Sequence, residues 1–495
     1  NGTNGSHGKN GHVAASPGGG LVDQAWLAEL AAKGGANAKP FLEEAAKAVG
    51  KPLASLEVAK ALDEKLSKLP SNQRSSFLVP RNGGLPETDA SLAPPQEECV
   101  YLVGNSLGLQ PSKTKELVCE ELDKWASLGV NGHFTGDRPW MPIDENVLEQ
   151  SAKVVGAEKS EVAIMNSLTV NLHLLFVSFF RPNGKRNKIM YEAAAFGSDY
   201  FAFESQARLH GLDPKEVLLP IKARDQELLR TEDIVSAIEA AGDTLATVCF
   251  GTVQYYTGQF FDVPTITNAA HKVGATAMWD CAHAVGNVDL KLHEWEVDGA
   301  CWCNYKYLNS GPGAIGGFFV HRKHHDKGLP LLAGWWGQKQ STRFNMAHNW
   351  DPEADAGAWR LSNPPVLQTV SLLASLEVFS RTTMAELRGK SMLLTTYLES
   401  LLRDSFGADL SVITPSLPAR GCQLSLKFSQ EKACLATFSA LEKRGIVVDH
   451  RKPNVIRVAP APLYNTFVDV QRFCAAFREA LEEATGEPAA KRAKA

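Results

Sequence analysis

Long apolar runs, cysteine pairs and an excess of basic residues are all missing from this chain of 495 residues. An apolar stretch such as 172–180 is much shorter than the roughly 18 residues that cross a membrane, and His173 and Ser178 interrupt it. The formal net charge of −4 argues against a nucleic-acid-binding body. We therefore expect a protein that binds neither membrane nor nucleic acid.

The nine cysteines are scattered along the chain and form no CxxC pair. Cys301 and Cys303 share a face if they lie on a strand, but no second pair completes a zinc site, so no metal is expected. Free thiols in a chain this long indicate a reducing compartment, and the cytoplasm is the expected location. Hydrophobic and charged contents of 44% and 21% are typical of a globular enzyme.

The length exceeds that of one ordinary core, and the pattern along the chain divides it into parts. Residues 1–20, rich in Gly, Asn and Ser, are predicted to be a disordered tail. Residues 21–99 carry helical patterns and then a linker, and are expected to pack on a small C-terminal α+β domain at 366–486. Residues 100–365 are predicted to form the large domain, and 487–495 a basic tail.

Helix-like and strand-like segments alternate through the large domain, which predicts an α/β fold with a mostly parallel central sheet and helices on both faces. Ser112 is expected to cap a helix that ends at Leu128, and Ser167 or Thr169 can cap the helix after the first strand. The expected strands lie at 162–165, 188–191, 216–219, 245–250 and 275–279.

Two apolar runs are followed by residues whose side chains can take part in catalysis. The run 275–279 leads to Asp280 and then His283, and the run 299–303 leads to Tyr305 and Lys306. Enzymes that use pyridoxal phosphate (PLP) need a lysine amine that bonds to the cofactor and a buried carboxylate that keeps the pyridine nitrogen protonated. Asp280 and Lys306 match this requirement, although strand-end residues of these types are also common as caps or solvent-facing groups.

Segments 280–288 and 301–309 closely resemble the kynureninases, a family of fold-type-I PLP hydrolases in tryptophan catabolism. Similar segments at 102–111, 131–140 and 456–465 follow in the right order, and the resemblance covers about residues 21 to 485. It implies the hydrolysis of L-kynurenine, and of 3-hydroxykynurenine, to anthranilate or 3-hydroxyanthranilate and L-alanine, a route toward pyridine nucleotides. It also implies PLP as cofactor and a homodimer with shared active sites.

The resemblance assigns roles to single residues. Lys306 and Tyr305 are implied to be catalytic, and Arg457 to grip the substrate α-carboxylate, with His133 and Asn363 toward the aromatic end of the substrate. The implied cofactor contacts come from strand ends and from two loops: Leu168, Thr169, Phe196, Gly197, Ser198, Asp199, Asp280, His283, Tyr305, Lys306, Trp335 and Asn363.

Four positions bear on how the site is assembled and how the cofactor is held. Trp335 and Asn363 belong to loops that, in the family, reach the cofactor of the neighbouring subunit. Gly197 stands where the family usually has Pro, which puts in question how firmly Phe196 is held. Gly251 stands where some members have Ser, so one hydroxyl that binds the cofactor phosphate is in question.

Other functions on the same fold are weighed against this one. A cysteine desulfurase needs a nucleophilic thiol on a loop beyond the lysine, but no cysteine lies between Cys303 and Cys422. A catalytically dead relative is expected to lack Lys306 or Asp280, and both are present. An aminotransferase stays open as the alternative, because it shares its first steps with the hydrolase.

Overall fold

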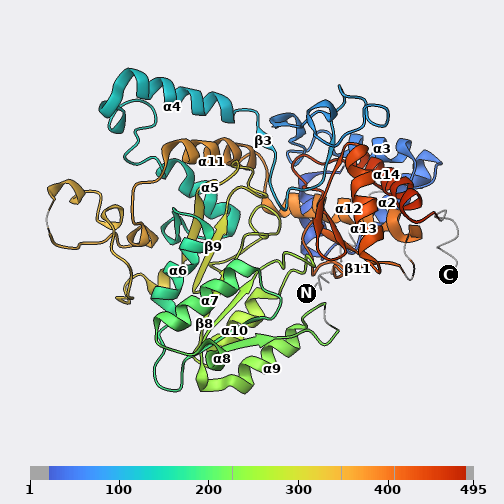
Figure 1. The fold of residues 1–495 in the computed structure, drawn as a ribbon. Helices are drawn as coiled ribbons and strands as arrows, with labels where there is room; N and C mark the ends of the chain where they lie inside the picture. The colour runs from blue at the N-terminus through green and yellow to red at the C-terminus, as the bar shows by residue number, and fades with distance from the viewer. Residues whose placement is uncertain (1–21, 226, 347, 406, 408, 487–495) are drawn as a thin grey trace, which may run out of the picture.

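The structure, a computed structural model, describes residues 22–486 except 226, 347, 406 and 408. Both predicted tails, 1–20 and 487–495, therefore lie outside the described residues. Figure 1 shows a central sheet flanked by helices, with the first and last parts of the chain packed together at one side.

A seven-stranded sheet forms the middle of the molecule, in the strand order β4-β10-β9-β8-β7-β5-β6. Among these strands β10 runs antiparallel to both of its neighbours, and the other six share one direction. The predicted α/β class with a mostly parallel central sheet is therefore confirmed. The strands are β4 (Val162–Ile164), β5 (Lys188–Glu192), β6 (Leu218–Ile221), β7 (Leu245–Gly251), β8 (Thr276–Asp280), β9 (Gly299–Cys303) and β10 (Gly316–Val320).

Helices cover both faces of this sheet because its strands are apolar on both sides. On β8, Met278 packs into the hydrophobic cluster that includes α6 and α7, and Trp279 packs into the opposite cluster with α5, α9, α10 and α11. Successive side chains of a strand point to opposite faces of the sheet, so the core has two layers. These helices are α5 (Glu145–Val155), α6 (Leu168–Phe179), α7 (Gly197–Leu209), α9 (Thr231–Ala241), α10 (Val263–Lys272) and α11 (Val366–Phe379).

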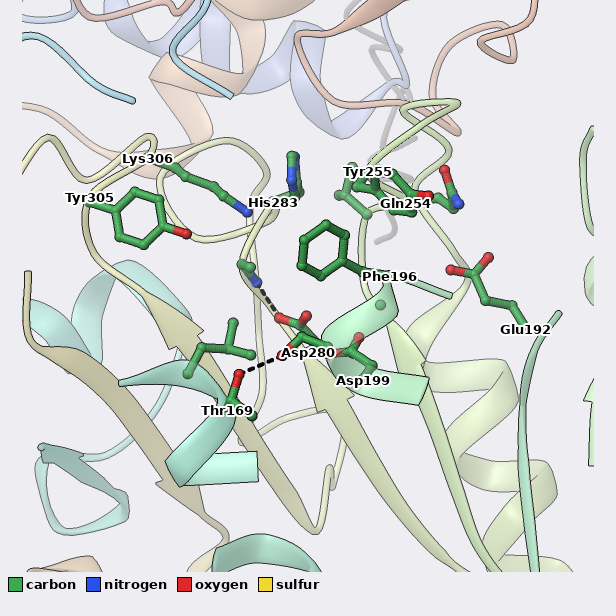
Figure 2. Close-up of a pocket in the computed structure, with 15 residues that line it drawn as sticks. Thr169, Glu192, Phe196, Asp199, Gln254, Tyr255, Asp280, His283, Tyr305 and Lys306 are labelled. Carbon is green, nitrogen blue, oxygen red and sulfur yellow. Dashed lines mark hydrogen bonds between the residues drawn. The ribbon is translucent and has the colours of Figure 1, made fainter. Parts of the chain in front are cut away.

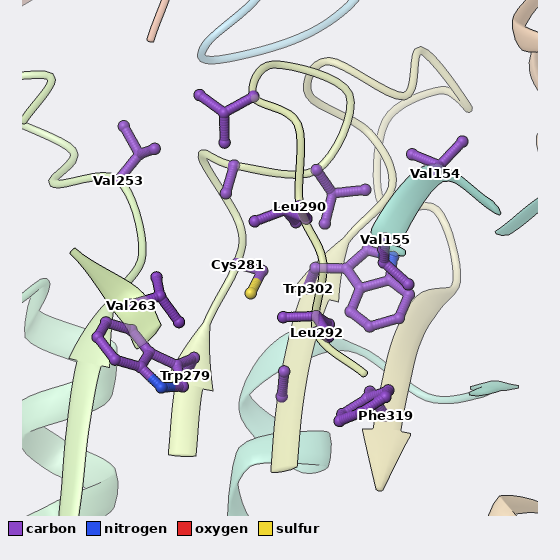
Figure 3. Close-up of a cluster of buried hydrophobic side chains, with 14 of the residues drawn as sticks. Val154, Val155, Val253, Val263, Trp279, Cys281, Leu290, Leu292, Trp302 and Phe319 are labelled. Atoms are coloured by element: carbon purple, nitrogen blue, oxygen red, sulfur yellow. The ribbon is translucent and has the colours of Figure 1, made fainter. Parts of the chain in front are cut away.

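Two tryptophans anchor the larger core layer (Figure 3). Trp279 and Trp302 are both 0% exposed, and the Trp279 indole N–H donates to the Thr267 hydroxyl at 3.1 Å. Gly317 on β10 pairs directly with Trp302 on β9, and a Cβ at Gly317 would lie 2.0 Å from the indole. The absence of a side chain at Gly317 is therefore what lets Trp302 lie in the sheet layer.

The two ends of the described chain share a second hydrophobic core. The Asp63 carboxylate of α3 accepts hydrogen bonds from the N–H groups of Phe467 (2.8 Å) and Val468 (3.0 Å), so the N-terminal segment caps the last helix. The helices of this core are α1 (Gln24–Ala32), α2 (Ala38–Val49), α3 (Leu56–Leu66), α12 (Met384–Leu402), α13 (Glu431–Lys443) and α14 (Phe467–Thr485). The division into domains at the predicted boundaries stays a prediction.

The strands at this side form an antiparallel sheet, in the order β11-β12-β15-β14. They are β11 (Leu410–Val412), β12 (Leu424–Phe428), β15 (Val455–Val458) and β14 (Asp449–Arg451). Two small pairs complete the described strands: β1 (Phe77–Leu78) with β3 (Gln110–Pro111), and β2 (Val100–Tyr101) with β13 (Ile446–Val447).

Two local predictions are wrong. The segment expected as a strand at 216–219 begins with a helical turn, α8 (Pro214–Val217), because the Asp213 side chain caps it through Lys215 N at 3.0 Å. Ser112 does not cap α4 (Thr114–Leu128), because Lys113 occupies the N-cap position, and no side-chain capping hydrogen bond is made there. In both places the helix boundary differs by a residue or two from the one expected.

We predict that Gly317→Ala lowers the free energy of unfolding by about 1–3 kcal/mol, because the new methyl group overpacks the core against Trp302. Chemical denaturation measures the change. Gly84→Ala is the matched control, because nothing lies within 4 Å of a Cβ at that position. Equal stability of the two variants would contradict the close packing of Gly317 on Trp302.

Candidate functional site

A pocket opens at the carboxyl ends of four neighbouring strands (Figure 2), the edge at which parallel α/β sheets bind ligands. Glu192 ends β5, Gly251 ends β7, Asp280 ends β8, and Tyr305 and Lys306 closely follow β9. The remaining walls of the pocket are Leu168, Thr169, Phe196, Ser198, Asp199, Val253, Gln254, Tyr255, Ala282 and His283.

Asp280 and Asp199 form a hydrogen-bonded carboxyl pair in this pocket. Burial raises the pKa of Asp199 well above its ordinary value, and the charge of Asp280 raises it further. Burial also raises the pKa of Asp280, but Lys306 and the Ala282 N–H, which donates to Asp280 at 2.7 Å, oppose that shift. The shared proton therefore resides on Asp199, and Asp280 keeps the negative charge.

Lys306 faces this carboxyl pair from the other side of the pocket, next to Tyr305 and His283 (Figure 2). Its Nζ lies 5.8 Å from the centre of the Tyr305 ring. Burial, followed by the nearby Cys303, raises the pKa of the Tyr305 hydroxyl, which therefore stays protonated at neutral pH. Burial and then the positive charge of Lys306 lower the pKa of His283 well below its ordinary value, so its imidazole is neutral.

The N-termini of α6 and α7 meet beside the pocket. The Thr169 and Ser198 hydroxyls lie 2.6 Å apart, one at the start of each helix, and Gly197 is the first residue of α7. Ser167 makes no side-chain capping bond to α6 and Thr169 instead bonds to Ser198, so the predicted capping role is wrong for both residues. The first N–H groups of each helix have no intrahelical partner, and two such ends can hold a phosphate.

Arg457 lies at the edge of the site rather than in the pocket wall. Its side chain is fully buried on β15, where it pairs with Asp449 at 2.8 Å. Its Nη1 donates to the carbonyl oxygen of Tyr255 at 2.6 Å, and the Tyr255 side chain lines the pocket. Nη2 makes the ion pair with Asp449 but has no hydrogen bond of good geometry within the described chain. The guanidinium thus has a side on which its hydrogen-bonding capacity is not used up, and an arginine of this kind can bind a carboxylate group.

Besides Arg457 and Gly197, three predicted site residues do not line this pocket within one chain. Trp335 is 48% exposed, Asn363 is exposed, and His133 is half-buried against Trp140. None of the three lines the pocket that the described residues form around Lys306.

Five residues of the pocket were missed by sequence reasoning: the apolar Val253 and Ala282, and Glu192, Gln254 and Tyr255, which carry polar groups. Glu192 did carry a signal, because an acid at the end of an apolar strand is the same pattern that identified Asp280. Burial, and then the charge of Asp280, raise the pKa of Glu192 to about 8.

This pKa predicts a pH-dependent stability. The unfolded chain releases the Glu192 proton near pH 4.5, whereas the folded chain holds it to about pH 8, so the folded state loses stability as pH rises through that window. We expect Glu192→Gln, which cannot ionise, to raise the free energy of unfolding of the ligand-free chain by roughly 2–4 kcal/mol at pH 8. The gain should vanish near pH 4.5, and a gain independent of pH would contradict the assignment.

Comparison with solved structures identifies the fold. The cysteine desulfurase CsdA from Escherichia coli matches with a TM-score of 0.66 and 17% identity, over 84% of this chain and 98% of that one. C-DES, solved with glycine covalently linked to its PLP cofactor, matches with a TM-score of 0.64 and 15% identity, over 79% and 98% of the two chains. The architecture is thus that of fold-type-I PLP enzymes.

Comparison with known sequences is more specific. The model of the family "Kynureninase C-terminal domain" matches residues 387–477. A kynureninase of Monosiga brevicollis is 49% identical over 88% of this chain and 98% of its own length. A kynureninase of Mus musculus is 50% identical over 84% of this chain and 91% of its own length. With such identity over nearly the whole described chain, the protein belongs to the kynureninase family.

Proposed function

We propose that the chain hydrolyses L-kynurenine, and 3-hydroxy-L-kynurenine, to anthranilate or 3-hydroxyanthranilate and L-alanine. The observation that carries the proposal is the meeting of Lys306 with the Asp280–Asp199 carboxyl pair in one pocket at the sheet edge. Relatives about 50% identical bear the name kynureninase, which supports this reaction over transamination.

The pocket fits PLP by the chemistry of its residues. The charged Asp280 suits a protonated pyridine nitrogen, and the buried Asp199 Oδ1, which has no hydrogen-bond partner within the described chain, leaves an acceptor for a bound group. The paired helix N-termini at Thr169 and Ser198 suit the phosphate, and Lys306 supplies the amine. A larger residue would fit at both Gly197 and Gly251, since a Cβ at either position meets nothing closer than 3.7 Å, so no close contact requires glycine there.

When bound, PLP supplies an electron sink for charge that develops at the substrate α-carbon. Arg457 binds the α-carboxylate, because its planar guanidinium matches two carboxylate oxygens. Lys306 Nζ would take the α-proton of the substrate and hold it for a later protonation step. Asp280 would hold a protonated pyridine nitrogen through its negative charge.

Cleavage of the Cβ–Cγ bond requires a water molecule at the γ-carbonyl and a proton for the departing carbon. Tyr305 suits this proton transfer, because burial keeps its hydroxyl protonated and it adjoins Lys306. The neutral His283 imidazole packs in the same pocket without adding a competing positive charge.

Assembly into a homodimer would complete the site. His133, Trp335 and Asn363 do not line the pocket of their own chain. Near two of them, the Phe344 ring lies beside the rings of Phe134 and Trp335, with ring centres 6.1 and 5.4 Å apart. Large exposed apolar side chains gather on the same segments: Trp125, Val130, Phe134, Trp335, Phe344, Met346 and Trp350. An apolar surface of this kind is typical of a subunit interface, and a two-fold dimer is the commonest closed assembly.

We place the protein in the cytoplasm, and its thiols support this location. All nine cysteines, from Cys99 to Cys474, are free in the structure, and eight of them are buried. Among the described helices none is both long and apolar enough to span a membrane.

Lys306→Ala should abolish the visible absorbance of bound PLP and all anthranilate production, because the bond to the cofactor and the proton-transfer group are lost together. The assay supplies L-kynurenine without a keto acid and follows anthranilate fluorescence and L-alanine. Lys33→Ala, at the C-terminal end of α1 where the exposed Lys33 side chain pairs with Glu29, is the control and should match wild type. Turnover that needs an added keto acid would instead identify an aminotransferase.

Shared active sites predict complementation between inactive chains. Lys306→Ala removes the amine of one site, and Asn363→Ala removes a group that the partner needs. In a mixed dimer one of the two sites retains both residues, so mixing the variants should restore up to about a quarter of wild-type activity for random exchange. Sedimentation of a fully active monomer, or mixtures that stay inactive despite proven subunit exchange, would contradict the dimer.

A further inference from the structure

A buried acid, Glu192, lines the pocket and has no part in the reaction described above. Its side chain is 4% exposed, and Figure 2 shows it on the side of the pocket opposite Tyr305 and Lys306. The side-chain amide of Gln254 donates a hydrogen bond to its carboxyl group. Burying a carboxyl group costs free energy. Glu192 therefore contributes to the structure through the hydrogen bond that it accepts from Gln254.

Gln254 is fixed through every polar atom of its side chain. Its amide oxygen accepts from the N–H groups of Tyr256 (2.6 Å) and Thr257 (2.7 Å). Its amide nitrogen donates to the carbonyl of Ala194 at 3.1 Å and to Glu192. Because the oxygen side and the nitrogen side are both occupied, the amide has one orientation, and it ties the turn at 254–259 to the end of β5.

The same turn reaches the C-terminal sheet. The Tyr255 carbonyl accepts from Arg457 Nη1 at 2.6 Å, and the Tyr256 carbonyl accepts from the Ser425 hydroxyl at 2.6 Å. The Tyr255 ring meets Phe196 edge to face, with ring centres 5.2 Å apart. The position of the Tyr255 carbonyl therefore fixes the direction of Arg457 Nη1. Gln254 in turn fixes the position of the backbone at Tyr255.

We propose that Glu192 and Gln254 are positioning residues that act through the Tyr255 carbonyl to hold Arg457 in the orientation that receives the substrate carboxylate. The inference rests on the proposed function, in which Arg457 binds that group. It assigns the pair no contact with reacting atoms. Loss of either residue frees the turn, and Arg457 then samples orientations in which its fork no longer faces the substrate.

The test uses the PLP-loaded enzyme with Glu192→Leu and Gln254→Met, which remove the hydrogen bond and keep similar volume. We expect KM for L-kynurenine, and Kd for L-alanine measured by equilibrium titration, to rise about two- to tenfold, as for one lost hydrogen bond. The value of kcat and the absorbance of bound PLP should stay near wild type. Glu192→Gln retains an acceptor for the Gln254 amide and should restore wild-type KM.

A matched control and a double-mutant cycle separate positioning from general loss of stability. Gln206→Met removes an equally buried glutamine, also 4% exposed, that bonds to His173, and it should leave KM unchanged. In an Arg457→Lys background, Gln254→Met should have no further effect on KM, because the arm that it positions is absent.

The experiment distinguishes failure of this inference from failure of the proposed function. An active wild type whose KM and L-alanine Kd are unchanged by Gln254→Met, or changed equally with Arg457→Lys present, would overturn the inference. Should Glu192→Leu fail to fold, Gln254→Met alone decides the matter. A wild type that neither hydrolyses L-kynurenine nor binds L-alanine would instead overturn the proposed function.

Discussion

The burial of three carboxyl groups beside a single lysine is the constraint on which the rest of the site depends. Glu192, Asp199 and Asp280 lie within one pocket that also holds Lys306. Three buried negative charges would be costly, so protons must be retained on some of these groups. The order of their pKa shifts leaves Asp280 as the charged member, which is the one that faces Lys306. Asp280 is thus the one carboxyl group of these three that stays charged, and it faces the positive charge of Lys306.

The sheet supplies the geometry that makes this selection possible. Parallel strands deliver their carboxyl ends to one edge, so Glu192, Gly251 and Asp280 meet although they are far apart in the sequence. The tryptophans of β8 and β9 fill the layer below, and the glycine on β10 gives Trp302 its place. A rigid core directly under the site keeps its polar groups at fixed separations.

The central sheet and the Asp280–Lys306 pair could be predicted from the sequence because they depend on local patterns. An apolar run followed by an acid or a lysine needs no knowledge of distant segments. β10 was not among the expected strands, since its Gly-Gly start lacks the usual strand composition. Ser112 and Thr169 were assigned as caps by residue type, but α4 has Lys113 at its N-cap, and the Thr169 hydroxyl bonds to Ser198, a partner distant in the sequence.

Other parts of the site could not be predicted from sequence for a different reason. Gln254 shows no pattern, because its importance arises from contacts with Ala194 and Glu192, about 60 residues away. His133, Trp335 and Asn363 carry roles that came only from the family resemblance, and a single chain does not test them. Their exposed positions agree with a site built by two subunits, which is a property of an assembly rather than of a local motif.

The core shared by the two ends of the chain has a consequence for biosynthesis. Helices α1 to α3 are made first, yet their partners α12 and α14 lie more than 300 residues later. At about 5–20 residues per second, a ribosome needs tens of seconds to produce them. During that interval the apolar faces of α1 and α3 that α12 and α14 cover in the folded chain, which include Leu27 and Leu62, stay exposed. The nascent chain therefore needs protection at its beginning until its last helix emerges and is capped by Asp63.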